Sequence, residues 1–180
     1  MNNTQSVLKI VLPKIRTVLS QAGINSLVVR AYQVTHQGIP SADAVIFYQV
    51  INAPPKCFEA TNQVYNAESD NFNIEHRQQS EMILRLSCRL LENPANEEPI
   101  YANDVLEQIR LRMFDESVID SLVSQGVGVY AKGGITNVDF KNDFNQYESM
   151  PFLELGISYI SGFNNTVARV IRVIGEDEPI

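Results

Sequence analysis

The feature that most constrains this chain is an alternation of side chains that runs without a break from Asn71 to Leu91. Its second half places apolar residues at even-numbered positions and Arg85 and Arg89 at odd-numbered ones. A period of two residues is typical of a β-strand with one buried face. A straight strand of this length would measure about 65 Å, which is longer than a domain of this size is wide. We therefore expect the strand to bend, or its polar first half to project from the body as an arm.

Other stretches make the first half of the chain rich in β-structure. Leu27–Val34 and Ala44–Ile51 are apolar, β-branched runs, and each is predicted to be a strand. The loop residues between them favour an antiparallel hairpin near the middle of a sheet. Asn52–Asp70 is predicted to be a long loop with a short strand at Glu59–Tyr65. For Gln79–Leu91 a helix is a second interpretation, because short apolar runs do not distinguish a strand from a helix.

Helical periodicity marks two segments of the sequence. The first is Ser6–Ala22, where Pro13 is expected to kink or divide the helix. The second is Tyr101–Ser124, with Asn103 as a candidate cap and a division expected near Asp115–Ser117. The side chains expected to be buried by this second segment are Val105, Leu106, Ile109, Met113, Ile119, Leu122 and Val123.

The last third of the chain returns to strand patterns. Val127–Ala131, Pro151–Ile160 and Thr166–Ile174 are each predicted to be a strand. Gly133–Gly134 marks a turn or bulge. The residues SGFNN, which are Ser161–Asn165, are predicted to turn the chain between the last two strands.

This order of elements predicts an α+β fold. Strands and helices do not alternate regularly, so a doubly wound parallel sheet is disfavoured. We expect one domain over residues 1–180, with a mostly antiparallel or mixed sheet and two main helices packed on one face. An extended strand or arm and a C-terminal extension over residues 166–180 complete the predicted architecture.

Charge and hydropathy limit the classes of partner. Fourteen basic and 21 acidic residues give a net charge of −7, whereas domains that grip a nucleic acid duplex carry a basic stripe. No stretch reaches the ~18 apolar residues that span a bilayer, and no signal-peptide pattern opens the chain. We expect a soluble protein without a membrane partner. Cys57 and Cys88 are expected to be reduced thiols, with a disulfide between them as a second interpretation.

Motifs for catalysis or cofactor binding are missing from the sequence. It has no GxSxG, HExxH, GxxxxGK[ST] or GxGxxG pattern. His36 and His76 lie far apart in a loop and a polar strand, without the further ligands that a metal needs. We therefore expect no enzymatic activity, no cofactor and no metal. The alternative is a small soluble enzyme or ligand-binding domain whose site is assembled only in three dimensions.

Three features follow one another along the chain. They are an opening helix that leads to two apolar strands, the strand NFNIEHRQQSEMILRLSC, and the ending GVYAKGGITNVDF followed by QYESMPFLELGISYISGF. This order resembles the tail terminator proteins of tailed bacteriophages, also called neck terminator or tail completion proteins. The family's middle strand is matched by Glu75–Leu86 and its closing strand by Glu148–Tyr159. The sequence departs from the family in its Asn52–Asp70 loop and its Val167–Ile180 extension.

The resemblance implies a structural virion protein of the tail or neck, assembled in the host cytoplasm. Such a protein forms a ring, expected to be a hexamer, that caps the head-proximal end of the tail tube and ends tube polymerisation. Its partners would be the tube protein, the neck or connector protein and a sheath where one exists. DNA would pass through the lumen without specific binding, which suits a net charge of −7.

The contacts of such a ring can be predicted from the strands. Strand edges offer unpaired N–H and C=O groups to a neighbour, and Asn71–Ser80 and Thr166–Ile174 are the candidates for strand addition. Arginines on these strands could pair with acidic groups of adjacent subunits or of the tube, or could be ordinary solvated residues. The residues predicted at the subunit or tube interface are Glu75, Arg77, Arg85, Arg89, Arg169, Ile171 and Arg172.

Overall fold

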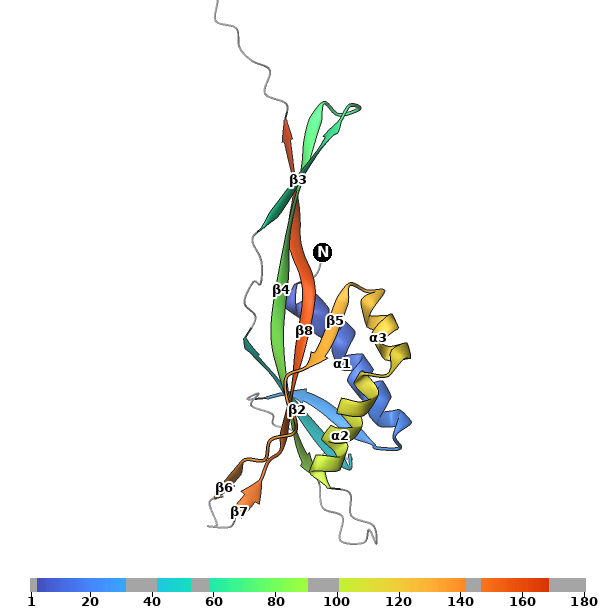
Figure 1. The fold of residues 1–180 in the computed structure, drawn as a ribbon, viewed down its shortest axis with the longest axis vertical. Coiled ribbons are helices and arrows are strands. Elements are labelled where there is room, and N and C mark those ends of the chain that lie inside the picture. Colours follow the sequence, from blue (N-terminus) through green and yellow to red (C-terminus); the bar gives the residue numbers. More distant parts are fainter. Residues whose placement is uncertain (1–2, 32–41, 53–58, 91–100, 142–146, 169–180) are drawn as a thin grey trace, which may run out of the picture.

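The computed structural model describes residues 3–31, 42–52, 59–90, 101–141 and 147–168. Within them the chain forms three helices and eight strands (Figure 1). The helices are α1 (Thr4–Gln21), α2 (Ala102–Met113) and α3 (Glu116–Val123). The strands are β1 (Ser26–Arg30), β2 (Ala44–Asn52), β3 (Ala60–Asn66), β4 (Asn71–Leu90), β5 (Val127–Ala131), β6 (Asp139–Lys141), β7 (Tyr147–Ser149) and β8 (Phe152–Ala168). The predicted α+β fold with a mixed sheet is confirmed.

The 20-residue strand β4 is central to the main sheet, whose strand order is β1-β2-β4-β8-β5. It pairs with β8 without a register shift, from Asn71 opposite Ala168 to Ser87 opposite Phe152. Its C-terminal half also pairs with β2, and its N-terminal half pairs with β3. The predicted alternation is therefore that of a strand, and the helical interpretation of Gln79–Leu91 is wrong.

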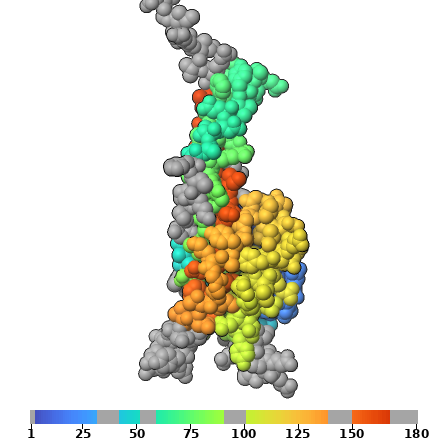
Figure 2. Space-filling view, viewed as in Figure 1, coloured from blue at the N-terminus to red at the C-terminus, as the bar shows by residue number. Residues whose placement is uncertain are grey.

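Three strands continue beyond the body of the molecule as a projecting arm (Figures 1 and 2). We define the arm as β3, residues 71–79 of β4, residues 160–168 of β8 and the turn over residues 67–70. Nine residues of extended strand measure about 30 Å. Of the two predicted outcomes for so long a strand, the projecting arm is the one that forms.

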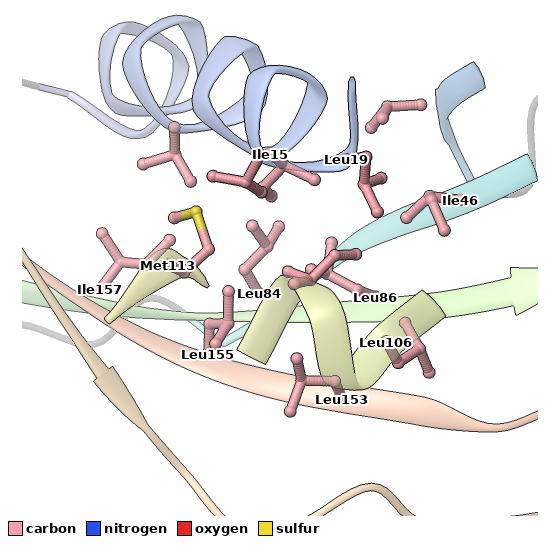
Figure 3. Close-up of a cluster of buried hydrophobic side chains, with 14 of the residues drawn as sticks. Ile15, Leu19, Ile46, Leu84, Leu86, Leu106, Met113, Leu153, Leu155 and Ile157 are labelled. Atoms are coloured by element: carbon pink, nitrogen blue, oxygen red, sulfur yellow. The ribbon is translucent and has the colours of Figure 1, made fainter. Parts of the chain in front are cut away.

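The helices gather on one face of the sheet in the body, as predicted (Figure 1). Figure 3 shows Ile15 and Leu19 of α1 directed toward Leu84 and Leu86 of β4, and all four side chains are fully buried. Each such side chain contributes roughly 2 kcal/mol through removal of its apolar surface from water. The even-numbered face of β4 therefore holds the core together.

The start of α1 is fixed by a reciprocal cap. Asn3 Oδ1 accepts a hydrogen bond from the backbone N–H of Ser6 at 2.8 Å, and Ser6 Oγ accepts one from the N–H of Asn3 at 2.7 Å. This arrangement satisfies backbone donors that the helix itself leaves unpaired. The helix then runs through Pro13 as one element, so the predicted division at that proline does not occur.

The second predicted helix is two helices, α2 and α3, divided where expected. Asp115 caps α3, because its Oδ1 accepts hydrogen bonds from the N–H and the hydroxyl of Ser117 at 3.0 and 2.6 Å. Asn103 does not cap α2, since the cap position is Tyr101 and makes no side-chain bond there. Val123 is 59% exposed at the end of α3, so its predicted burial is wrong.

Two predictions about the strands are also wrong. β1 and β2 are parallel, not an antiparallel hairpin, and β1 lies at the edge of the sheet. The segment that joins them is long enough for the crossover of about a dozen residues that a parallel pair requires. Ser161–Asn165 does not turn the chain, because each of these residues pairs with β4 and continues β8. The long partner strand supplies their hydrogen bonds, and this overrides the turn preference of Gly and Asn.

Candidate interaction surfaces

One face of the arm carries an apolar stripe. It has the same parity on β4 as the core residues, so the stripe continues the buried face of the body into a region that no described helix covers. The Tyr65 and Phe72 rings lie 5.3 Å apart, and the His76 and Phe163 rings stack at 4.4 Å. We define the apolar stripe by its five members, which are Tyr65, Phe72, Ile74, Phe163 and Val167.

The arm is also where the molecule exposes its large apolar side chains. Ten such side chains are exposed among the described residues, and five of them belong to the two outer strands of the arm. Those five are Val64 and Tyr65 of β3 and Ile160, Phe163 and Val167 of β8. Exposed apolar side chains scattered singly need no explanation, whereas a group on one narrow projection marks an interaction surface.

The tip of the arm is held by local polar contacts. The Tyr65 hydroxyl donates to Asp70 Oδ1 at 2.6 Å, and the backbone N–H of Glu68 donates to Asn66 Oδ1 at 3.0 Å. Asp70 has a φ of 48°, a left-handed conformation that Asp tolerates in tight turns. The turn therefore fixes Tyr65, so that a stripe residue presents one defined conformation.

The opposite face of the arm carries its charged pair, together with the exposed Val64 and Ile160. Arg77 Nη2 lies 2.9 Å from Glu75 Oε1, so these two predicted interface residues pair with each other. The Arg77 side chain is 57% exposed, and the Glu75 side chain 27%. An exposed pair of this kind contributes little to stability, but it neutralises the charge that Arg77 was expected to offer to a neighbour.

Arg85 lies in the body and is fully engaged there. Its Nε and Nη2 donate to Glu154 Oε1 at 3.0 and 2.7 Å, and its guanidinium lies 4.3 Å from the centre of the Phe152 ring. Arg85 and Glu154 are direct cross-strand partners of β4 and β8. These contacts support the alternative interpretation of this arginine, in which it belongs to the sheet itself.

Arg89 differs from the other described arginines of β4. It is exposed and forms no ion pair with any residue in the described ranges. It lies at the end of β4 far from the arm, opposite Val45 of β2. The structure thus places Glu75, Arg77, Arg85 and Arg89 on one face of one strand but spreads them along its length. Arg169, Ile171 and Arg172 lie outside the described residues.

A groove lies where the arm meets the body. It holds about 510 Å³ and runs along β8 at Ser158, Tyr159 and Ile160, with Gly126 and Gly128 at one side. Beside it, the Ser80 and Ser161 hydroxyls lie 2.7 Å apart across β4 and β8. The groove lies where the pairing of β5 with β8 ends, at Tyr159. Beyond Tyr159, no described strand pairs with this edge of β8.

Residues with catalytic or metal-binding chemistry do not gather in the part of the chain that the structure describes. No group of three or more His, Cys, Asp or Glu residues there can hold a metal ion. Burial raises the pKa of the Cys88 thiol to about 12, which leaves it protonated and unreactive. His36 and Cys57 lie outside the described residues. Among those described, no helix is long and apolar enough to cross a membrane.

Sequence reasoning missed the residues that matter most on the arm. Phe163 and Val167 continue the alternation of Leu153, Leu155, Ile157 and Tyr159 along β8. That continued period of two is the available signal, but the Gly and Asn residues around Phe163 favour a turn when the sequence is considered alone. Asn71–Ser80 is predicted to be a strand edge, but its residues 71–77 are paired on both sides, so for them the prediction is wrong.

Comparison with models of known protein families gives a match over most of the chain. The family model described as "E217 gateway protein gp29" matches residues 6–169. No curated protein matches. Among solved structures, a similar chain is the sheath/tube terminator of an extracellular contractile injection system, PVC, in its extended state. That chain is 12% identical with a TM-score of 0.46, and the alignment covers 99% of this chain and 65% of that one.

Proposed function

Because the chain belongs to the family of the E217 gateway protein gp29, we propose that it forms a ring at the head-proximal end of a phage tail tube. The predicted relation to tail terminators is confirmed at the level of the family. The expectation that the chain is not an enzyme is confirmed in the same way, since this family consists of structural tail proteins. The alternative of a small soluble enzyme is therefore wrong.

The observation that carries the proposal is the arm with its apolar stripe. A projection about 30 Å long buries little surface of its own, yet it holds five of the ten large exposed apolar side chains of the described residues. Tyr65 and Phe163, which are 44% and 59% exposed, gain from removal from water only when another molecule covers them. We infer that contacts between subunits or with tail proteins cover the arm.

A ring follows from the kind of contact that such an arm makes. An arm that packs against a different surface of the next copy gives a heterologous interface, and such an interface forms a ring when the rotation from copy to copy closes on itself. Six copies are proposed from the resemblance to tail terminators. The ring would stop tube growth, join the tube to the neck or connector, contact a sheath where one exists, and let DNA pass through its lumen.

The charge of the chain agrees with a passage for DNA. Its net charge is −7, and each copy in a ring adds the same charge. A lumen wall with acidic character repels the phosphate backbone, so DNA moves through without being held. Of the predicted interface arginines that the structure describes, Arg77 and Arg85 are engaged within the chain, and Arg89 is exposed and has no ion pair with a described residue.

Two measurements test the proposal: the mass of the oligomer that the chain forms, and the length of tail tubes grown in its presence. Light scattering or native mass spectrometry of the purified chain, alone and with the tail tube protein, should give a closed oligomer of one size. Added to growing tubes, the chain should shorten them, as measured by electron microscopy, while an unrelated acidic protein leaves their length unchanged. A monomer at every concentration with and without tube protein, together with unaltered tubes, would contradict the proposal.

A further inference from the structure

The two outer strands of the arm have free edges of matching kind. Among the described strands, β3 pairs only with β4, so no described strand pairs with the other edge of β3. β8 pairs with β5 over residues 155–159, and no described strand pairs with that edge of β8 along residues 160–168. Open edges present rows of backbone N–H and C=O groups that another strand can pair with.

Neither open edge has the protection that a monomer needs. The sequences ATNQVYN in β3 and ISGFNNTVA in β8 contain no charged residue and no proline. Soluble proteins block such edges with lysine, proline or a bulge. Of the charged residues of the arm, Glu75 and Arg77 lie on the central strand β4 and Glu68 and Asp70 lie in the turn at the tip, so none of them is on an outer strand. The two edges are therefore suited to strand addition.

The direction of the strands points to a second copy of this chain as the partner. β3 and β8 are each antiparallel to β4, so they run in the same direction. Rotation about an axis along the arm keeps all arms pointing the same way. β3 of one copy then lies parallel to the β8 edge of the next copy, over strands of seven and nine residues.

Such a rotation also leaves each residue at the same position along the axis in every copy. The rows of residues within one copy therefore predict which residues are neighbours across the junction. Within one copy Tyr65, Phe72 and Val167 form one row of the sheet, and Gln63, Ile74 and Asn165 form another. Tyr65 of one copy would lie beside Val167 of the next. The row that holds Tyr65, Phe72 and Val167 then continues from one copy to the next, and Tyr65 and Val167 shield part of each other from water.

We propose that β3 of one copy pairs in parallel with residues 160–168 of β8 in the next copy, so that the arms form one closed, continuous sheet. This inference rests on the proposed ring and specifies the contact that closes it. Both outer strands of the arm are used in every copy, which leaves no free strand edge among the arms.

A charge exchange at Gln63 and Asn165 tests the junction. Both side chains are exposed and face the same side of the arm. Within one copy they are separated by β4, about 10 Å apart, whereas across the proposed junction they are direct neighbours about 5 Å apart. Like charges at direct cross-strand positions weaken pairing and opposite charges support it.

The double variant Gln63→Lys/Asn165→Lys should raise the concentration at half assembly at least about tenfold, because every junction carries the repulsion. Gln63→Lys/Asn165→Glu should restore assembly to within about twofold of the unaltered chain. Native mass spectrometry measures assembly, and circular dichroism verifies that both variants fold. Leu111→Lys on α2, which is 55% exposed in the unaltered chain, is the control for a new charge off the arm.

The outcomes distinguish the pairing of β3 with β8 from the formation of a ring. An oligomer that forms equally well with Gln63→Lys/Asn165→Lys contradicts the edge pairing and leaves the ring intact. Loss of assembly in both double variants also contradicts it, because opposite charges must rescue a true junction. If the unaltered chain never assembles, alone or with tube protein, the ring and the edge pairing both fail.

Discussion

Arg85 and Glu154 face each other across β4 and β8, and Arg85 Nε and Nη2 both donate to the same carboxylate oxygen, Oε1, at 3.0 and 2.7 Å. The Phe152 ring lies 4.3 Å from the same guanidinium. These contacts tie the two longest strands together in the body, just before they leave it as the arm.

Arg85→Ala should lower stability without lowering assembly. Loss of the ion pair and of the ring contact should cost about 1 kcal/mol, or roughly 2–4 °C in the unfolding temperature. Arg89→Ala, which removes an exposed arginine from the same strand face, is the matched control and should leave that temperature unchanged. Calorimetry measures both. If Arg85→Ala leaves the unfolding temperature unchanged but abolishes assembly, Arg85 is an interface residue instead.

Gly156→Ala should destabilise the body, because an added Cβ would lie 2.2 Å from the Tyr130 ring. The ring must move or the strands must separate, at an expected cost of about 1–3 kcal/mol. Gly134→Ala is the control, since nothing lies within 4 Å of its added Cβ. Urea unfolding gives both free energies. In a chain that already carries Tyr130→Ala, the Gly156→Ala substitution should have no further cost, and a persistent cost would exclude the steric explanation.

Phe163→Ser should weaken assembly while changing the free energy of unfolding by less than about 1 kcal/mol. The reason is that Phe163 is 59% exposed in the isolated chain and gains burial only from a neighbour. Val123→Ser on α3 is the matched control, because Val123 is also 59% exposed but lies off the arm. Sedimentation velocity reports the oligomer. Equal loss of assembly in the two variants would remove the special role of the arm.

The cap of α3 should make stability depend on pH at the acidic end. Hydrogen bonds from the side chain and backbone of Ser117 hold the pKa of Asp115 below its ordinary value of 3.8. A lowered folded-state pKa means that the contribution is complete above the ordinary value and is lost as pH falls through the folded-state value. Asp115→Asn keeps a good cap without a titrating group. Unfolding temperatures from pH 7 to about pH 3 should therefore fall less steeply in Asp115→Asn; parallel curves would contradict this.

Much of the fold could be predicted because its local signals agree with its tertiary contacts. The alternation of β4 matches a strand whose even-numbered side chains are buried, and the division near Asp115 matches a real cap. The parallel pairing of β1 and β2 could not be predicted, because the sequence of an apolar strand does not indicate whether its neighbour runs parallel or antiparallel to it. The prediction for Ser161–Asn165 is wrong because turn preference is local, whereas the pairing partner of this segment lies more than eighty residues earlier in the sequence.

The candidate site was predicted less well for a related reason. Charge is visible in a sequence, so the prediction favours the arginines of β4, but their partners Glu75 and Glu154 become apparent only in the structure. The apolar stripe combines residues of three strands, and none of them looks unusual alone. Exposure is a property of the assembled sheet, so Tyr65 and Phe163 could not be recognised before it.

The late position of β8 in the chain sets the time at which the arm can exist. Of the three strands of the arm, β3 and β4 are synthesised first, and their arm residues can then form no more than a two-stranded hairpin, which is marginally stable on its own. The third strand follows only after α2, α3 and β5 have left the ribosome. A nascent chain that has not reached β8 therefore lacks the complete three-stranded arm. In the proposed ring, a subunit can pair through its arm only after its synthesis has passed β8, and unfinished chains are kept out of the assembly.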